Sequence, residues 1–185
     1  MSGTVILAIV LAVIVVAGVA ALLVTRNRKG GGRGSDLRRR FGPEYDRLAA
    51  ERGDPKAVEE ELTGRVREHD ALQLHPLAPD ERERYEHTWS TVQERFIDDP
   101  RGAVQQADQV IGGLLTAIGY PSENRERQLD LASVDHARAL GDYRRAHETT
   151  TAETSDTEAL RNALLGYRVM FEDLLGTTEH AHAGR

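Results

Sequence analysis

The sequence predicts an all-α protein with an N-terminal transmembrane helix, a flexible glycine-rich linker and a bundle of five to seven short helices. Three observations favour this class. One stretch is uniformly apolar, apolar residues recur every three or four positions in nearly every later segment, and no later segment alternates β-branched with polar residues. The 185 residues allow one ordinary domain plus an appendage.

The apolar stretch covers residues 5–24 and contains no charge, amide or hydroxyl. A helix of this length spans roughly 30 Å, the thickness of a bilayer's hydrocarbon core. A cleaved signal peptide would need a basic start and an apolar stretch of only about 7–15 residues, whereas residues 1–4 carry no basic side chain. We therefore expect an uncleaved transmembrane helix over residues 1–25, with an exported domain released by cleavage as the alternative.

Four basic residues follow the apolar stretch, namely Arg26, Arg28, Lys29 and Arg33. Only the α-amino group charges the other end. The positive-inside rule therefore predicts that the N-terminus lies outside the cell and that the rest of the chain lies in the cytoplasm. The same four residues are expected at the membrane surface, where each cation gains about 1 kcal/mol from anionic headgroups.

Residues 26–35 are expected to form a basic, flexible linker because they are rich in glycine. A phosphate-binding loop is disfavoured, since no Gly-Lys-Ser/Thr follows. Residues 36–176 are expected to form an acidic α-helical domain, and residues 177–185 a disordered tail. From residue 36 onward the chain holds 20 basic and 30 acidic residues, a net charge of −10, which disfavours nucleic-acid binding.

The first part of the helical domain predicts two helices and an irregular segment. Apolar residues follow one another at spacings of four and three over residues 37–48, with a break at Pro43 and an end at Gly53. Asp54 and Pro55 have the pattern of an N-cap followed by proline at the first helical position. Two prolines make residues 73–79 irregular.

The second part predicts a helix from about Asp80 to Ile97, a helix that follows the Asp99-Pro100 cap, two short helices around Asp135, and a final helix closed by Gly176. Apolar residues on the inner faces of these helices are expected to form the core. They include Trp89, Val92, Phe96, Val110, Leu114, Leu164, Tyr167 and Phe171.

No complete catalytic motif is present, and no catalytic, cofactor-binding or metal-binding residue is predicted. The absence of cysteine excludes disulfides, thiol catalysis and cysteine-ligated metals. Among the seven histidines there is no His-Glu-x-x-His pattern, and the one Glu-x-x-His match, Glu179–His182, falls in the expected tail. Glu83, Asp135, His136 and His147 are the candidates for an unfamiliar acid/base site.

Six stretches carry a further signal, and the pattern to which they belong extends over most of residues 37–175. They are residues 37–47, 77–85, 89–96, 119–121, 130–136 and 143–147. In these stretches the chain resembles a recurrent actinobacterial family of uncharacterised membrane or secreted proteins. Ala137 stands where a proline is expected, and the linker is richer in glycine than usual. The resemblance implies an N-terminal membrane anchor with a helical domain and no known activity.

The function that these features predict is a membrane-tethered helical module for protein interaction or scaffolding, without enzymatic activity. Its expected partners are the lipid bilayer, through residues 5–24, and a protein partner or a second copy of the chain. Neither a nucleic acid nor a small molecule is expected to bind. The alternatives are a membrane-bound enzyme with an unrecognised acid/base site and an exported helical domain.

Overall fold

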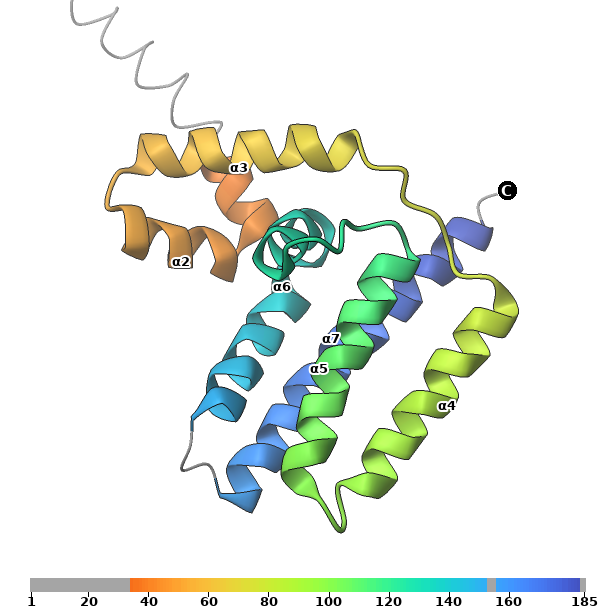
Figure 1. The fold of residues 1–185 in the computed structure, drawn as a ribbon. Helices are drawn as coiled ribbons and strands as arrows, with labels where there is room; N and C mark the ends of the chain where they lie inside the picture. The colour runs from red at the N-terminus through yellow and green to blue at the C-terminus, as the bar shows by residue number, and fades with distance from the viewer. Residues whose placement is uncertain (1–33, 153–155, 184–185) are drawn as a thin grey trace, which may run out of the picture.

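The computed structural model describes residues 34–152 and 156–183, and this part of the chain is all-α, as predicted. A helical segment over residues 34–41 comes first. Six helices follow: α2 (Pro43–Arg52), α3 (Pro55–Asp70), α4 (Pro79–Arg95), α5 (Pro100–Ala117), α6 (Arg125–Thr151) and α7 (Thr157–Ala183) (Figure 1). The last two are not short, since each contains 27 residues.

The predicted transmembrane helix and the basic residues Arg26, Arg28, Lys29 and Arg33 lie outside the described residues. Within residues 34–152 and 156–183, no helix combines the length and the apolar character needed to cross a bilayer.

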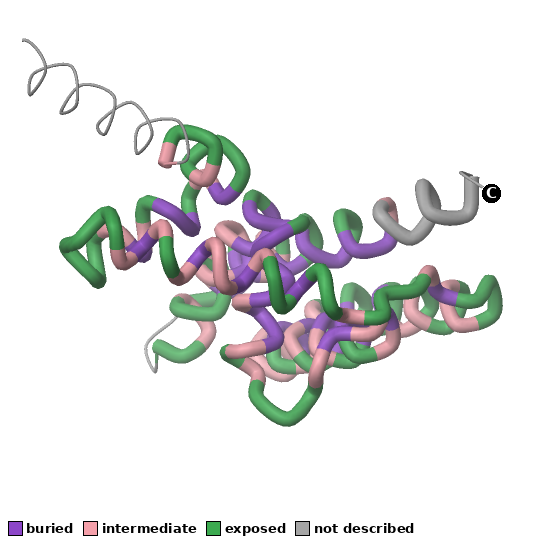
Figure 2. The backbone as a smooth tube through the Cα atoms, turned by 90° about the horizontal axis from the view of Figure 1, so that it is seen from above, coloured by how far each residue is buried: buried purple, intermediate pink, exposed green. Residues whose placement is uncertain are grey.

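The helices are built around two hydrophobic cores. The larger core joins α4, α5, α6 and α7, and Figure 1 shows α5 lying across α7 with α4 beside it. The smaller core joins residues 34–41, α2 and α3 to the first half of α6, through Phe41, Tyr45, Leu48 and Val134 among others. Buried positions follow the inward faces of the helices, while the outward faces are exposed (Figure 2). Helix α6 belongs to both cores.

The two predicted Asp-Pro helix starts are confirmed in detail. The Asp54 side chain accepts a hydrogen bond of 3.0 Å from the backbone N–H of Lys56. The Asp99 side chain accepts one of 2.9 Å from the backbone N–H of Gly102. Each aspartate thereby satisfies one of the free donors at a helix N-terminus, and the proline that follows has no N–H to satisfy.

Helix α6 bends at His136, whose φ of −116° and ψ of 26° are not helical. In Figure 1 the first half of α6 is seen end-on and the second half lengthwise. This bend confirms the prediction of two helical pieces around Asp135, although they join without a loop. The bend lets the first half of α6 complete the smaller core while the second half packs along α7.

Two predicted boundaries are wrong. Gly34 and Ser35, assigned to the linker, are already helical. Helix α7 continues past Gly176 to Ala183, where the sequence predicted a helix end and a disordered tail. A glycine ends a helix when it adopts a left-handed conformation, as Gly53 does at φ 67°. Gly176 keeps a helical backbone, so the residue type alone was a misleading signal.

The predicted core is confirmed at six of its eight positions, and Phe96 and Leu164 are only partly buried at its edge. At its centre Trp89 of α4 and Phe171 of α7 stack, with ring centroids 4.5 Å apart and ring planes 13° apart. Both side chains are buried. This contact joins α4 to α7, although α5 and α6 lie between them in the sequence.

Replacing Phe171 by alanine should therefore lower the free energy of unfolding by about 3–5 kcal/mol, because it removes a buried aromatic ring and leaves a cavity beside Trp89. Ile97→Ala is the control, because the Ile97 side chain is 82% exposed and its truncation should change stability by less than about 0.5 kcal/mol. Chemical denaturation of both variants measures the difference. Equal stabilities would show that the stack does not hold the bundle together.

Candidate functional site

The four acid/base candidates do not form one site. Glu83 and His147 are exposed on α4 and on the second half of α6, respectively. Asp135 and His136 lie at the bend of α6, but each contacts a different partner. The structure thus divides the candidates among three places.

The polar cluster at the bend consists of two histidine–aspartate pairs around a buried tyrosine. The Nε2 atom of His69 lies 3.2 Å from an oxygen of Asp135, and the Nδ1 atom of His136 lies 2.6 Å from an oxygen of Asp173. The hydroxyl of Tyr120 lies 3.4 Å from His69 Nε2, and its ring meets that of His136 edge-on at 6.3 Å. The cluster thus joins the end of α3, the α5–α6 loop, α6 and α7.

The chemistry of this cluster favours a structural role. Both histidines are buried, and each is already paired with a carboxylate. Burial, with the negative charges of Asp135 and Asp173 in addition, raises the pKa of Tyr120 and keeps its hydroxyl neutral. A neutral tyrosine between paired histidines can donate and accept hydrogen bonds across the bend. Of this cluster, sequence reasoning missed His69, Tyr120 and Asp173 as partners.

His147 belongs to a second polar cluster, between α5, α6 and α7. The Tyr143 hydroxyl donates to Asp108, and Arg125 donates to the same carboxylate at 3.2 Å. The His147 ring stacks on that of Tyr143, and its Nδ1 atom lies 3.4 Å from the Tyr167 hydroxyl. Burial raises the pKa of Tyr167 to about 12. These hydrogen bonds and ring contacts therefore connect α5, α6 and α7.

The most buried charges form an ion network that sequence reasoning missed. The side chains of Glu44 (α2) and Arg65 (α3) are each 3% exposed, and their charged atoms lie 2.8 Å apart. Arg65 also lies 3.1 Å from Asp130 of α6, and Arg144 of α6 lies 3.3 Å from Glu44. A sequence signal exists, since Arg65 continues the buried stripe of Val58 and Leu62 on α3.

Burial by itself would raise the pKa of Glu44. The hydrogen bond from Arg47 and the charges of Arg144 and Arg65 outweigh that effect, so the pKa of Glu44 lies below its ordinary value of 4.5. Burial raises the pKa of Asp130 despite the neighbouring arginines. The network thus favours ionised Glu44 and ties α2 and α3 to α6.

Replacing Glu44 by glutamine should lower the free energy of unfolding at neutral pH by about 3 kcal/mol, since it leaves buried arginines without their shared anion. The matched control is Glu51→Gln on the same helix, because the Glu51 side chain is exposed and its ion pair with Arg47 is at the surface. Loss of an exposed pair should cost less than about 1 kcal/mol.

The same variant tests the sign of the pKa shift. A carboxyl whose pKa is lower in the folded state stabilises the protein above its unfolded pKa, and this stabilisation is lost as the pH falls through the folded pKa. The stability gap between the wild type and Glu44→Gln should therefore narrow as the pH falls below 4.5, the ordinary pKa of a glutamate. Denaturation at a series of pH values measures it. A gap that widens on acidification would contradict the assignment.

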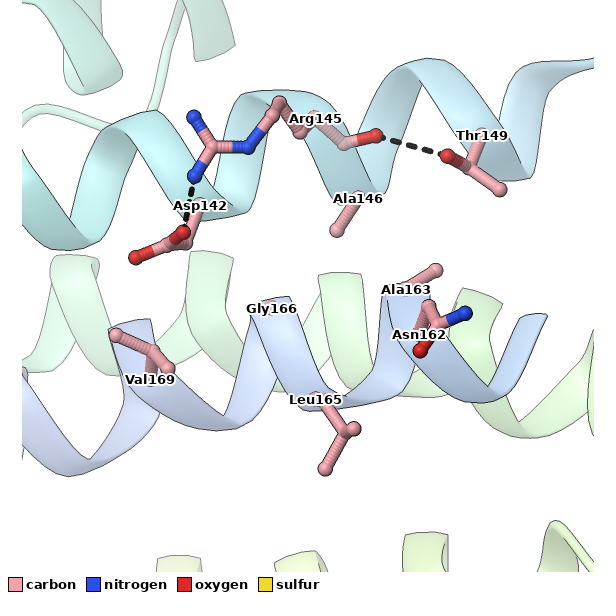
Figure 3. A pocket seen from close by; sticks show the side chains of 9 residues that line it. All are labelled: Asp142, Arg145, Ala146, Thr149, Asn162, Ala163, Leu165, Gly166 and Val169. Carbon is pink, nitrogen blue, oxygen red and sulfur yellow. Dashed lines mark hydrogen bonds and ion pairs between the residues drawn. The ribbon is translucent and has the colours of Figure 1, made fainter. Parts of the chain in front are cut away.

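A groove of about 400 Å³ lies between the second half of α6 and the first half of α7 and is here called the α6–α7 groove (Figure 3). Small side chains dominate its centre, where Ala146 faces Ala163 and Gly166. The aliphatic side chains of Leu165 and Val169 also line it. Its polar residues are Asp142, Arg145, Thr149 and Asn162, and Asp142 and Arg145 are ion-paired with each other.

Gly166 explains why the two helices approach so closely beside this groove. A Cβ atom at this position would lie 2.8 Å from the backbone oxygen of Asp142 and 3.0 Å from the Cβ of Ala146. The two helices are therefore too close at their crossing for any side chain at position 166. Leu165 and Val169, one helical turn apart on α7, are 53% and 44% exposed.

Replacing Gly166 by alanine should thus lower the free energy of unfolding by about 1–3 kcal/mol, because α6 and α7 must move apart. Gly64→Ala in α3 is the matched control, since a Cβ there meets no atom within 4 Å. That control should stabilise the protein by about 0.5–1 kcal/mol, the usual gain from glycine to alanine inside a helix. Thermal and chemical denaturation of both variants measure the difference. A stabilised Gly166→Ala variant would contradict the close crossing.

The structure gives no indication of a metal centre in the part of the chain that it describes, where no three histidine, aspartate or glutamate side chains gather as ligands. Comparison with family models, with curated proteins and with solved structures gives no match for this chain. The resemblance to an actinobacterial membrane family therefore stays a prediction from the sequence.

Proposed function

We propose that this chain is a membrane-tethered helical interaction module that binds another protein chain through the α6–α7 groove. The observation that carries the proposal is the exposure of Leu165 and Val169 beside a floor of small side chains. In residues 34–152 and 156–183 only four large aliphatic side chains are recorded as exposed, and two of them line this groove. Aliphatic side chains exposed next to a concave surface mark sites of protein contact.

The state of the titratable groups supports an interaction module over an enzyme. An acid/base enzyme would have to use the cluster at the bend, because that is where Asp135 and His136 lie. There each histidine is engaged with its own aspartate, and these pairs connect helices. Glu83 and His147 are exposed on α4 and on the second half of α6, away from these pairs.

The membrane part of the proposal is supported by the sequence. Residues 5–24 are uniformly apolar, and Arg26, Arg28, Lys29 and Arg33 follow within a short distance. Such a segment would anchor the helical domain at the cytoplasmic face of the membrane. Tethering raises the effective concentration of the domain at the bilayer, so a groove of modest size becomes sufficient for binding there.

The interaction is tested by chemical crosslinking of the full-length chain in native membranes, with crosslinked peptides identified by mass spectrometry. We expect crosslinks from α6 and α7 to a protein chain, and Val169→Glu should lower their yield several-fold because it places a charge in the groove. Ile97→Glu, which adds the same charge at an exposed position on the α4–α5 turn, should leave the yield unchanged. If the wild-type chain gives no crosslinks from α6 or α7, the proposed function is wrong.

The sidedness of the domain is tested separately. Protease added to intact cells stripped of their wall should leave residues 36–185 uncut, with a cytoplasmic protein as the control for sealed membranes. Neutral residues in place of Arg26, Arg28, Lys29 and Arg33, with lysines added after Ser2, should invert part of the population, because the charge bias is then reversed. Digestion of the wild-type domain would indicate an outward-facing or exported domain instead.

A further inference from the structure

We propose that residues 34–70 open from α6 as one cooperative unit while α4–α7 stay folded, so that these helices form a reserve of tether length. The unit consists of the helical segment over residues 34–41 with α2 and α3, and is here called the N-terminal unit. Its opening follows from the way it is attached to the bundle, and only its use as a tether rests on the proposed function.

The N-terminal unit is attached mainly to one helix. The principal contacts of α2 and α3 are with each other and with α6, and Figure 1 shows both helices beside the first half of α6 and away from α4. Among the buried residues that form the smaller core, Val134 is the one that comes from α6, and the others belong to the unit itself. Apolar burial therefore holds the unit together more than it holds the unit to the bundle.

Charged and polar pairs supply much of the attachment to α6. They are Glu44–Arg144 at 3.3 Å, Arg65–Asp130 at 3.1 Å, His69–Asp135 at 3.2 Å, Arg40–Asp135 at 3.6 Å, and Glu68–Arg127. Buried charges lose their hydration when the unit docks, and they regain it when the unit opens. The attachment therefore costs less free energy to open than an apolar interface of the same extent.

The bundle keeps its own contacts when the unit opens. The larger core contains no residue of the N-terminal unit, and it holds the first half of α6 through Leu131 and Ala132 among others. The connection to α4 also stays in place, since Leu77 is buried in the larger core and the backbone N–H of His75 donates to the carbonyl of Ile118 at 3.1 Å. The opening therefore stops at the C-terminus of α3.

An open N-terminal unit lengthens the connection between the bundle and the chain before residue 34. The unit is shorter than about 40 residues, the length below which an isolated domain seldom keeps its fold unaided. We therefore expect it to unfold once it leaves α6, and at full extension it would span roughly 120 Å. In a chain anchored through residues 5–24, this extension would let the bundle reach partners farther from the bilayer.

Native-state hydrogen exchange of the full-length chain in detergent micelles tests the opening. Each amide exchanges at a rate set by the free energy of the opening that exposes it. We expect the slowest amides of α2 and of α3 to share one protection factor, at least about tenfold below that of the slowest amides of α5. Protection factors of α2 and α3 equal to those of α5 would overturn the proposal, and so would separate values for α2 and α3.

A substitution in the larger core distinguishes the two openings. Ile111→Ala removes a fully buried side chain of α5, so it should speed exchange in α5 by more than about tenfold. Exchange in α2 and α3 should change by less than about twofold, because the larger core stays intact while the unit opens. Ile111→Val is the milder variant should alanine prevent folding. A parallel rise of exchange in α2, α3 and α5 would mean that the chain opens only as a whole.

A substitution in the attachment separates detachment from fraying within the unit. Glu44→Gln should speed exchange in both α2 and α3 by more than about tenfold, because it leaves Arg65 and Arg144 without their shared anion. Glu51→Gln, which removes an exposed pair on the same helix, should have an effect of a few-fold at most. Unchanged exchange in α3 of the Glu44→Gln variant would contradict an opening of the unit as a whole.

These outcomes are independent of the α6–α7 groove, because α6 and α7 line it and the N-terminal unit contributes no residue to it. If the unit opens while native membranes give no crosslinks from α6 or α7, the proposed function is wrong and the opening stands. If the crosslinks form while α2 and α3 are as protected as α5, the interaction function stands and the opening is wrong.

Discussion

The bend of α6 at His136 is the feature on which the rest of the structure depends. Before the bend, α6 lines both cores, with Leu129, Leu131 and Ala132 in the larger one and Val134 in the smaller one. At His136 the helix changes direction, and its second half packs along α7 with Leu140 in the larger core (Figure 1). The cost of broken helical geometry is offset by the pairs His69–Asp135 and His136–Asp173, which connect the bend to α3 and α7.

Ion pairs also connect the helices that form the two cores. The helices α2 and α3 meet α6 through the network of Glu44, Arg65, Asp130 and Arg144, and the larger core has a comparable tie through Asp108 and Arg125. Buried charges lose their hydration, and only close pairing with several partners compensates for that loss. A single substitution within such a network is therefore more harmful than the loss of any surface pair.

How much of this fold the sequence predicts depends on how local the signal is. The caps at Asp54 and Asp99, the break at Pro43 and the burial of Trp89 and Phe171 each follow from neighbouring residues or helical spacing, and all are confirmed. The end of α7 was predicted wrongly because Gly176 can be helical or left-handed, and nothing local decides between the two.

The candidate site was less predictable, because its members come from distant parts of the chain. Tyr120 and Asp173 belong to the cluster at the bend only through the packing of the α5–α6 loop and α7 against α6. Arg65 stands in an apolar stripe, and Glu44 also stands at helical spacing between Phe41 and Leu48, but nothing in the sequence pairs these two residues with each other. The groove was also beyond sequence reasoning, because a glycine in α7 reveals a close crossing only once its neighbour is known.

The bend at His136 also determines where the α6–α7 groove lies relative to the smaller core. Residues 34–41, α2 and α3 form the smaller core with Val134 of α6, whereas the groove lies between the second half of α6 and α7 (Figure 1). The contribution of α6 to the smaller core and its contribution to the groove are therefore on opposite sides of His136. Because the bend is fixed by buried pairs, the groove has a defined direction relative to the N-terminal helices. A groove whose walls are held by buried contacts in this way is preformed, so a ligand that entered it would not have to order it first.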